Sequence, residues 1–272
     1  RHSEVSLASK AIVGAIWTVA TRLGSRLVGL IGTLVITRFL APEVMGEVGV
    51  AVIAVLTAQF ASDLAFGQYI VVRSKDNPAA VFHAFFFNIV TTLVASGLLL
   101  LTMVPLGALL GAEEIERYLP VMVLSLILER LARIPESIAL RELRFKLFSI
   151  GSAVSELAYV GVSLGMAAAG FGGDSIVWAN VAQYGLRLLW FAIAVERSLW
   201  LVPCRLSWEQ SRDLLRFGVP LAIGNVAHFF PGRREIFDRI GFFDEELIRN
   251  QDDELNFRLL RQGGRILLLP DV

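Results

Sequence analysis

The chain is poor in charge and in cysteine. Only 18% of its 272 residues are charged, whereas about a quarter of the residues of a soluble domain usually are, so the side chains that would cover a globular surface are missing. The formal net charge is zero, which argues against nucleic acid as a partner. Cys204 is the single cysteine, which excludes an internal disulfide. We expect no cysteine-based metal cluster and no cofactor.

Long apolar runs take the place of the missing charge. A helix needs about 20 largely apolar residues to cross a bilayer, and six stretches reach that length: 11–37, 48–72, 79–108, 118–138, 147–169 and 176–195. Pro105 predicts a kink or an end in the third stretch. A shorter apolar segment, 217–230, contains Pro220 and fits a re-entrant, an interfacial or a truncated helix. The fold class predicted for residues 1–230 is an all-α transmembrane helix bundle of about six spans.

Lysine and arginine in the short loops predict the orientation of this bundle. With a cytoplasmic N-terminus, the outside loops carry only Arg38 and Arg117. The inside segments carry thirteen basic residues: Arg1, Lys10, Arg73, Lys75, Arg130, Arg133, Arg141, Arg144, Lys146, Arg197, Arg205, Arg212 and Arg216. Because basic residues accumulate on the cytoplasmic side, we predict a multi-pass protein of the cell (inner) membrane with its N-terminus in the cytoplasm.

Several charged residues fall inside the predicted spans. An arginine at the centre of a bilayer costs about 2.5–3.5 kcal/mol on insertion scales, so it usually faces a partner or a wet cavity. The candidate substrate pathway consists of these residues: Arg22, Arg26, Asp63, Glu129, Arg130, Arg133 and Arg187. Guanidinium groups suit phosphate or diphosphate, so the pattern is compatible with an anion-attracting pathway.

A structural explanation of the same charges stays open. Arg22 and Arg26 share one helix face because they are four residues apart, and Asp63 is the nearest acidic candidate to pair with them. Glu129 and Arg133 have the spacing of an i,i+4 pair, which would leave Arg130 free. Arg187 would then reach a membrane surface or pair with Asp63 or Glu129.

Four segments of the membrane part resemble polysaccharide flippases. They are TRLGSRLVGLIGTLVITRFLAPEVMGEVGVA (21–51), SDLAFGQYIVVRSKD (62–76), IPESIALRELRFKLFSIGSAVSELAYVGVSLGMAAAGFG (134–172) and RFGVPLAIGNVAHF (216–229). Together they are similar to the lipopolysaccharide or O-antigen exporters of the MOP superfamily. The resemblance implies one lobe of a MOP-type transporter that moves lipid-linked oligosaccharide precursors between leaflets. It also implies contact with membrane lipid and a second lobe or a homo-oligomer, because such transporters have two lobes.

The composition changes class after residue 230. Residues 231–272 hold 16 of the 50 charged groups of the chain and predict a short cytoplasmic α/β fragment of helix, turn, helix, turn and strand. This stretch resembles the C-terminal half of a family-2 glycosyltransferase catalytic domain, in the motif from Arg233 to Glu245 and in Asp252, Glu254, Leu255 and Arg258. By this resemblance Asp252 stands at the position of the catalytic base.

The glycosyltransferase activity is nevertheless not expected. The nucleotide-sugar-binding half and its Asp-x-Asp metal site do not occur in the sequence, and Asp252 to Glu254 also fit a solvated helix face. Three functions remain as hypotheses: a flippase lobe in surface-polysaccharide synthesis, a membrane-associated glycosyltransferase fragment acting in exopolysaccharide synthesis, and a nonfunctional gene fusion.

Overall fold

The computed structural model describes residues 23–24, 27–30, 32, 34–73, 77–201 and 204–227. The chain divides after residue 222, and the contacts described here lie before that point. The elements in chain order are α2 (Pro42–Ser62), α3 (Phe66–Arg73), α4 (Pro78–Leu101), α5 (Met103–Leu110), α6 (Ile115–Arg141), α7 (Phe145–Ala168), α8 (Asp174–Ala194), the 3₁₀ turn η1 (Arg197–Leu199) and α9 (Trp208–Ala227). The predicted strand and the tail from residue 231 lie outside the described residues.

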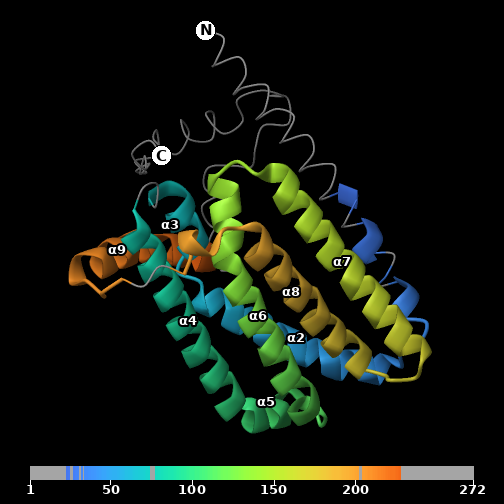
Figure 1. Ribbon diagram of the computed structural model, residues 1–272. Coiled ribbons are helices and arrows are strands. Elements are labelled where there is room, and N and C mark those ends of the chain that lie inside the picture. Colours follow the sequence, from blue (N-terminus) through green and yellow to red (C-terminus); the bar gives the residue numbers. More distant parts are fainter. Residues whose placement is uncertain are drawn as a thin grey trace, which may run out of the picture. The chain divides into compact units, whose positions relative to one another are not determined.

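Helix α6 lies at the centre of the lobe. It contacts α2, α3, α4, α5, α7 and α8, and Figure 1 shows α4 and α8 running beside it, with α7 on the far side of α8. Helices α7 and α8 pack closely on each other because Gly151 leaves room for the Trp190 ring; a Cβ at residue 151 would lie 2.5 Å from that ring. Small residues permit such close approach between membrane helices.

Four helical segments among the described residues are long and apolar enough to cross a membrane: Pro42–Arg73, Pro78–Leu101, Phe145–Ala168 and Asp174–Ala194. Large apolar side chains point outward from several helices, with Leu101, Leu109 and Ile193 each about 80% exposed. Outward apolar side chains need hydrocarbon around them. The chain is therefore a multi-pass membrane protein with an all-α transmembrane fold. Helix α6 has the length of a span but carries several charges, and the first predicted span lies mostly outside the described residues.

The second predicted span, 48–72, is interrupted in the structure. Helix α2 begins earlier, at Pro42, and ends at Ser62; α3 starts at Phe66. Ala65 between them has a left-handed backbone with φ of 55°, and its N–H donates to Oδ1 of Asp63 over 2.9 Å. A side chain that accepts from the backbone two residues on stabilises a turn, so the helix stops here.

The third predicted span, 79–108, also consists of two helices, and Pro105 does not mark the boundary. Helix α4 is capped at its start by Asn77, whose side chain accepts from the Ala80 N–H over 3.1 Å, and it ends at Leu101. Pro105 lies in the first turn of α5, where a proline is tolerated because it has no N–H to donate. Figure 1 shows α5 turning away from α4.

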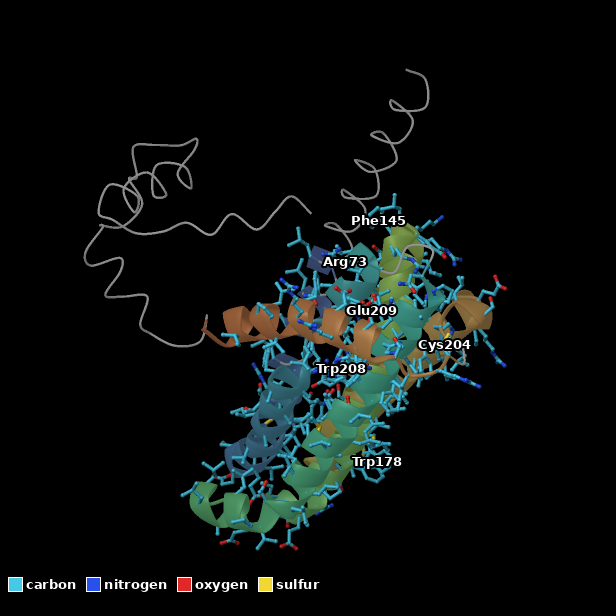
Figure 2. All side chains as sticks on the ribbon, turned by 90° about the vertical axis from the view of Figure 1, so that its left-hand side faces the viewer. Arg73, Phe145, Trp178, Cys204, Trp208 and Glu209 are labelled. Atoms are coloured by element: carbon cyan, nitrogen blue, oxygen red, sulfur yellow. The ribbon has the colours of Figure 1, made fainter. Side chains whose placement is uncertain are left out.

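Helix α9 (Trp208–Ala227) begins nine residues before the apolar segment 217–230 predicted from the sequence. Its connection from α8 is held by His83, whose Nε2 accepts from the Ser207 N–H over 2.9 Å. Figures 1 and 2 both show α9 lying across the direction of α4 rather than along it. This orientation favours the interfacial interpretation of the segment.

Candidate functional site

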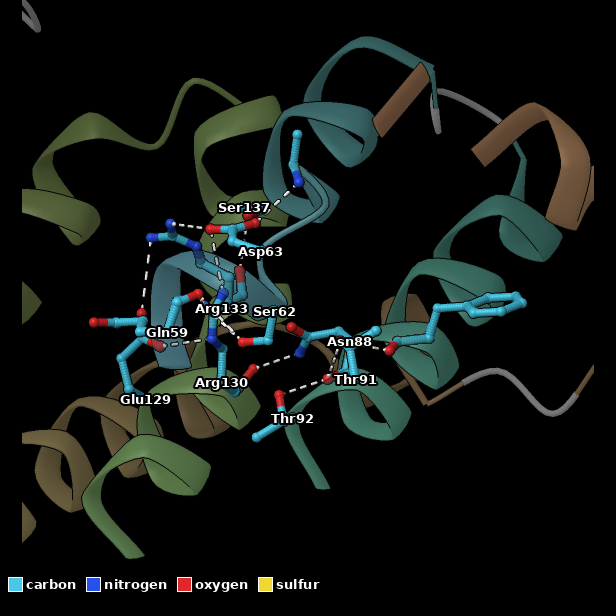
Figure 3. A network of polar contacts seen from close by, with 12 residues as sticks. Gln59, Ser62, Asp63, Asn88, Thr91, Thr92, Glu129, Arg130, Arg133 and Ser137 are labelled. Atoms are coloured by element: carbon cyan, nitrogen blue, oxygen red, sulfur yellow. Dashed lines mark hydrogen bonds and ion pairs between the residues drawn. The ribbon is translucent and has the colours of Figure 1, made fainter. Parts of the chain in front are cut away.

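The candidate site is a charged network inside the apolar lobe, built where α2 gives way to α3 (Figure 3). Asp63 stands at this break, and its Oδ1 is occupied by the backbone of Ala65. Its Oδ2 lies 3.2 Å from Nη1 of Arg130 and 3.3 Å from Nη2 of Arg133. Asp63 thus joins two arginines of α6 to the end of α2.

Arg130 is the most buried charged group of the network. Its side chain is 2% exposed, and its Nη2 donates to the carbonyl of Gln59 and lies 3.4 Å from Oγ of Ser62. Its Nε lies 3.4 Å from Oε2 of Glu129, yet neither atom has a hydrogen-bond partner, so this contact is electrostatic. The buried guanidinium is therefore held chiefly by α2 and Asp63.

Helix α4 is hydrogen-bonded to α6 at Arg130. Nδ2 of Asn88 donates to the backbone carbonyl of Arg130 over 2.8 Å, and Oγ1 of Thr92 donates to the carbonyl of Asn88 over 2.6 Å. Asn88 and Thr92 are both buried. A buried amide with such a bond fixes the relative position of two helices because an unpaired polar group would be costly there.

Arg133 differs from Arg130 because its side chain is 36% exposed. It opens on a pocket of about 280 Å³ between α3 and α6, whose wall is mostly apolar. The pocket is lined by Gly67, Gln68, Val71, Val72, Arg133, Glu136, Ser137 and Leu140. A Cβ at residue 67 would lie 2.9 Å from Oγ of Ser137, so the glycine keeps α3 close to α6. The partly exposed guanidinium has donors left for an anion entering the pocket.

A second group of polar contacts joins α6, α7 and α8. Arg187 of α8 forms an ion pair with Glu136 of α6. One turn away, Nε2 of Gln183 donates to Oε2 of Glu156 on α7 over 2.9 Å. Glu136 lines the Arg133 pocket as well, so the two groups meet at that pocket.

The numbers of arginines and carboxylates in these two groups of contacts are nearly equal. Arg130, Arg133 and Arg187 face Asp63, Glu129 and Glu136, while Glu156 adds one further carboxylate. Charges taken out of water are tolerated when paired and hydrogen-bonded. The network is therefore mainly a scaffold, and its most exposed member, Arg133, has the most freedom to bind a ligand.

Two other hollows are less suited to a charged ligand. A cavity of about 40 Å³ beside Glu129 is lined in part by Asn180 and Tyr184; this size admits water but no sugar. A hollow of about 600 Å³ between α2, α4 and α5 is lined almost entirely by apolar side chains, among them Ile53 and Leu98. Across the part of the chain that the structure describes, no group of three or more His, Cys, Asp or Glu side chains could hold a metal ion.

The structure brings together most of the charged residues predicted for the pathway. Asp63, Glu129, Arg130 and Arg133 form one network, and Glu129 does pair with Arg133, at 3.9 Å. The prediction that this pair leaves Arg130 free is wrong, because Arg130 is the best-paired arginine of the network.

The partner expected for Arg187 was also wrong: it pairs with Glu136 rather than with Asp63 or Glu129. The prediction from the sequence omits Glu136 and Glu156, although both lie inside predicted spans, where an acidic residue is as rare as an arginine. Arg22, Arg26 and Asp252 lie outside the described residues.

Comparisons with known proteins agree with a membrane transporter fold. The family described as "Polysaccharide biosynthesis protein" matches residues 35–237. The succinoglycan biosynthesis transport protein ExoT of Rhizobium meliloti (strain 1021) is 25% identical over 167 residues, which are 61% of this chain and 33% of that protein.

Two crystal structures of MATE are similar in fold. MATE in complex with MaD3S has a TM-score of 0.56 and 17% identity, over 78% of this chain and 53% of that one. A single-residue variant of MATE has a TM-score of 0.51 and 17% identity, over 80% of this chain and 52% of that one. This chain therefore spans about a third of the curated relative and about half of the solved structures.

Proposed function

Because this chain belongs to the polysaccharide biosynthesis protein family, we propose that it is one lobe of a flippase-type transporter for lipid-linked oligosaccharide precursors of a surface polysaccharide. The observation that carries the proposal is Arg133, whose guanidinium is 36% exposed and opens on a pocket between α3 and α6 inside an otherwise apolar lobe. A relative of this chain is named as a succinoglycan biosynthesis transport protein.

The proposed role of Arg133 is to bind the diphosphate of the substrate. A diphosphate cannot cross hydrocarbon without compensation of its charge. The guanidinium offers a planar set of donors that fits phosphate oxygens. Asp63 occupies Nη2, while Glu129 is 3.9 Å from Nη1, so the second contact is loose and can be exchanged for an anion.

The distribution of charge supports the orientation in the inner membrane with a cytoplasmic N-terminus. Figure 2 shows Arg73, Phe145 and Glu209 toward one end of the bundle and Trp178 toward the other. The first end has eight described basic residues, which are Arg73, Arg141, Arg144, Lys146, Arg197, Arg205, Arg212 and Arg216. The opposite end has only Arg38 and Arg117, beside six acidic residues: Glu43, Glu47, Glu113, Glu114, Glu116 and Asp174. The basic end belongs in the cytoplasm by the positive-inside rule.

Transport by this lobe requires a second one. The solved structures of similar fold are about twice as long as the matched part, so the proposal includes a partner lobe or a second copy of this chain. We place the boundary of the flippase-like region near residue 230, with residues 231–272 as a separate glycosyltransferase-like fragment.

Binding of a charged lipid tests the proposal without requiring transport. The purified chain is titrated in detergent with a polyprenyl diphosphate that carries a disaccharide, and with the polyprenol lacking the diphosphate. A hydrogen bond to a charged group contributes about 1.5–3 kcal/mol, so Arg133→Gln should weaken binding of the diphosphate roughly ten- to a hundredfold.

The control variants separate charge from fold. Arg133→Lys keeps the charge without the planar donors and should lose only part of the affinity. Arg38→Gln removes an exposed arginine from the opposite end and should bind as the unmodified chain does. Equal binding by Arg133→Gln, or equal binding of the lipid without diphosphate, would disprove the proposed role of Arg133.

A further inference from the structure

Helix α9 points one stripe of side chains away from the rest of the lobe. Its Ser211, Leu214 and Gly218 are buried and have the spacing of a single helix face. The exposed stripe lies on the other side and consists of Trp208, Arg212, Arg216 and Val219, which follow one another at intervals of four, four and three residues. The Trp208 side chain is 78% exposed. This stripe combines an aromatic ring with two cations, and exposed Glu209 lies at its edge.

The orientation of α9 is fixed by contacts to α3. The Tyr69 hydroxyl donates to Oδ2 of Asp213 over 3.0 Å, and the Tyr69 and Phe217 rings meet edge to face at 5.6 Å. A Cβ at residue 218 would lie 2.2 Å from the carbonyl oxygen of Leu64, so Gly218 sits directly on the backbone of the break before α3. These contacts hold α9 across the bundle, as Figures 1 and 2 show.

The segment before α9 also exposes apolar and basic side chains. Leu201 is 49% exposed and Leu206 is 52% exposed, and Arg205 between them is exposed as well. Tryptophan is enriched where hydrocarbon meets headgroups because one end of its ring is apolar and the other can donate a hydrogen bond. Arginines on such a helix face meet lipid phosphates.

We propose that α9 lies in the headgroup layer of the cytoplasmic leaflet and binds anionic phospholipid through Arg212 and Arg216, with Trp208 as its anchor at the edge of the hydrocarbon. Asp213 accepts from Tyr69, while exposed Glu209 lies three residues before Arg212 on the same face and is outnumbered there by Arg212 and Arg216. Because α9 rests on Leu64, next to Asp63, lipid binding would hold the break between α2 and α3 in place.

Lipid-dependent stability tests the charge recognition. Thermal unfolding of the purified chain is followed in neutral detergent with added phosphatidylglycerol, phosphatidylcholine or glycerol phosphate. Phosphatidylglycerol should raise the midpoint temperature of unfolding, whereas phosphatidylcholine and glycerol phosphate should not. Each basic residue near an anionic surface contributes about 1 kcal/mol, so Arg212→Gln with Arg216→Gln should weaken the apparent affinity about 30-fold.

Matched variants make the result decisive. Arg38→Gln at the opposite end should keep the full response, and Arg212→Lys with Arg216→Lys should keep most of it because the charge remains. The same response in the double glutamine variant, or an equal response to phosphatidylcholine, would overturn the proposal.

A second measurement on the folded chain does not depend on the arginine variants. Brominated phospholipids quench tryptophan fluorescence at a depth set by the bromine position. The contribution of Trp208 is the difference in emission between the unmodified chain and Trp208→Phe. Lipids with bromine near the headgroup should quench this contribution, whereas lipids with bromine at the ends of the acyl chains should leave it almost unchanged. Emission from Trp208 that no brominated lipid quenches would place α9 outside the headgroup layer and refute the inference.

Discussion

Replacing Arg130 with glutamine should destabilise the lobe more than any other single change in its charged network. The side chain is 2% exposed and reaches Asp63, Glu129 and the carbonyl of Gln59. Glutamine cannot supply the charge, so Asp63 and Glu129 are left with Arg133 as their shared cation.

The expected loss in the free energy of unfolding follows from the charges that remain after the substitution. Removing one partner of a buried ion pair costs about 3–5 kcal/mol, because the other charge stays buried without compensation. Asp63 keeps Arg133 at 3.3 Å, which places the cost near the lower end, at about 3 kcal/mol. Adding Glu129→Gln restores neutrality, so the double variant should be more stable than the sum of the single effects implies, by about 1–2 kcal/mol.

The free energy of unfolding is measured from reversible unfolding in mixed micelles with increasing denaturing detergent, followed by circular dichroism. Arg38→Gln, a change at an exposed position, should stay within about 0.5 kcal/mol of the unmodified chain. A cost below about 1 kcal/mol for Arg130→Gln, or strict additivity with Glu129→Gln, would refute the assignment of a charge-balanced buried network.

Two further predictions concern the packing of α9 and the orientation of the chain. Gly218→Ala would bring a Cβ to 2.2 Å from the Leu64 carbonyl oxygen and should lower the free energy of unfolding by about 1–3 kcal/mol. The control Gly161→Ala, where nothing lies within 4 Å of the added Cβ, should be neutral or stabilising in the same unfolding assay. Equal effects of the two changes would contradict the packing of α9 on Leu64. In right-side-out membrane vesicles, Cys204 should not react with a membrane-impermeant maleimide until the vesicles are opened. A cysteine introduced as Glu113→Cys in a Cys204→Ser background should react at once. The reverse pattern would contradict the proposed topology.

Two spans could be predicted closely from the sequence, although each holds one charged residue, Glu156 or Arg187. Residues 147–169 and 176–195 correspond to Phe145–Ala168 and Asp174–Ala194, because hydropathy falls off sharply where a helix leaves the bilayer. The break after Ser62 could not, since a left-handed alanine depends on what surrounds it: Ala65 is 1% exposed, and Gly218 packs beside it on Leu64.

The members of the charged network could be predicted, but their partners could not. Ionisable residues inside apolar spans are rare, so their position alone points to Asp63, Arg130 and Arg133. Which arginine is buried depends on how α2 and α4 approach α6, and Asn88 and Gln59 contribute to that through bonds that no spacing in the sequence reveals. The pairing of Arg187 with Glu136 likewise depends on the packing of α8 against α6.

The most direct test of the proposed substrate pathway is photochemical cross-linking in membranes that synthesise the lipid-linked oligosaccharide. A photoreactive phenylalanine analogue replaces Gln68, which lines the Arg133 pocket, or Ile53, which lines the apolar hollow between α2, α4 and α5. If the pocket belongs to the pathway, radiolabelled lipid-linked saccharide will cross-link at position 68, and the adduct will disappear when Arg133 is changed to glutamine. Cross-linking at position 53 alone, or an adduct at position 68 that persists without Arg133, would contradict it.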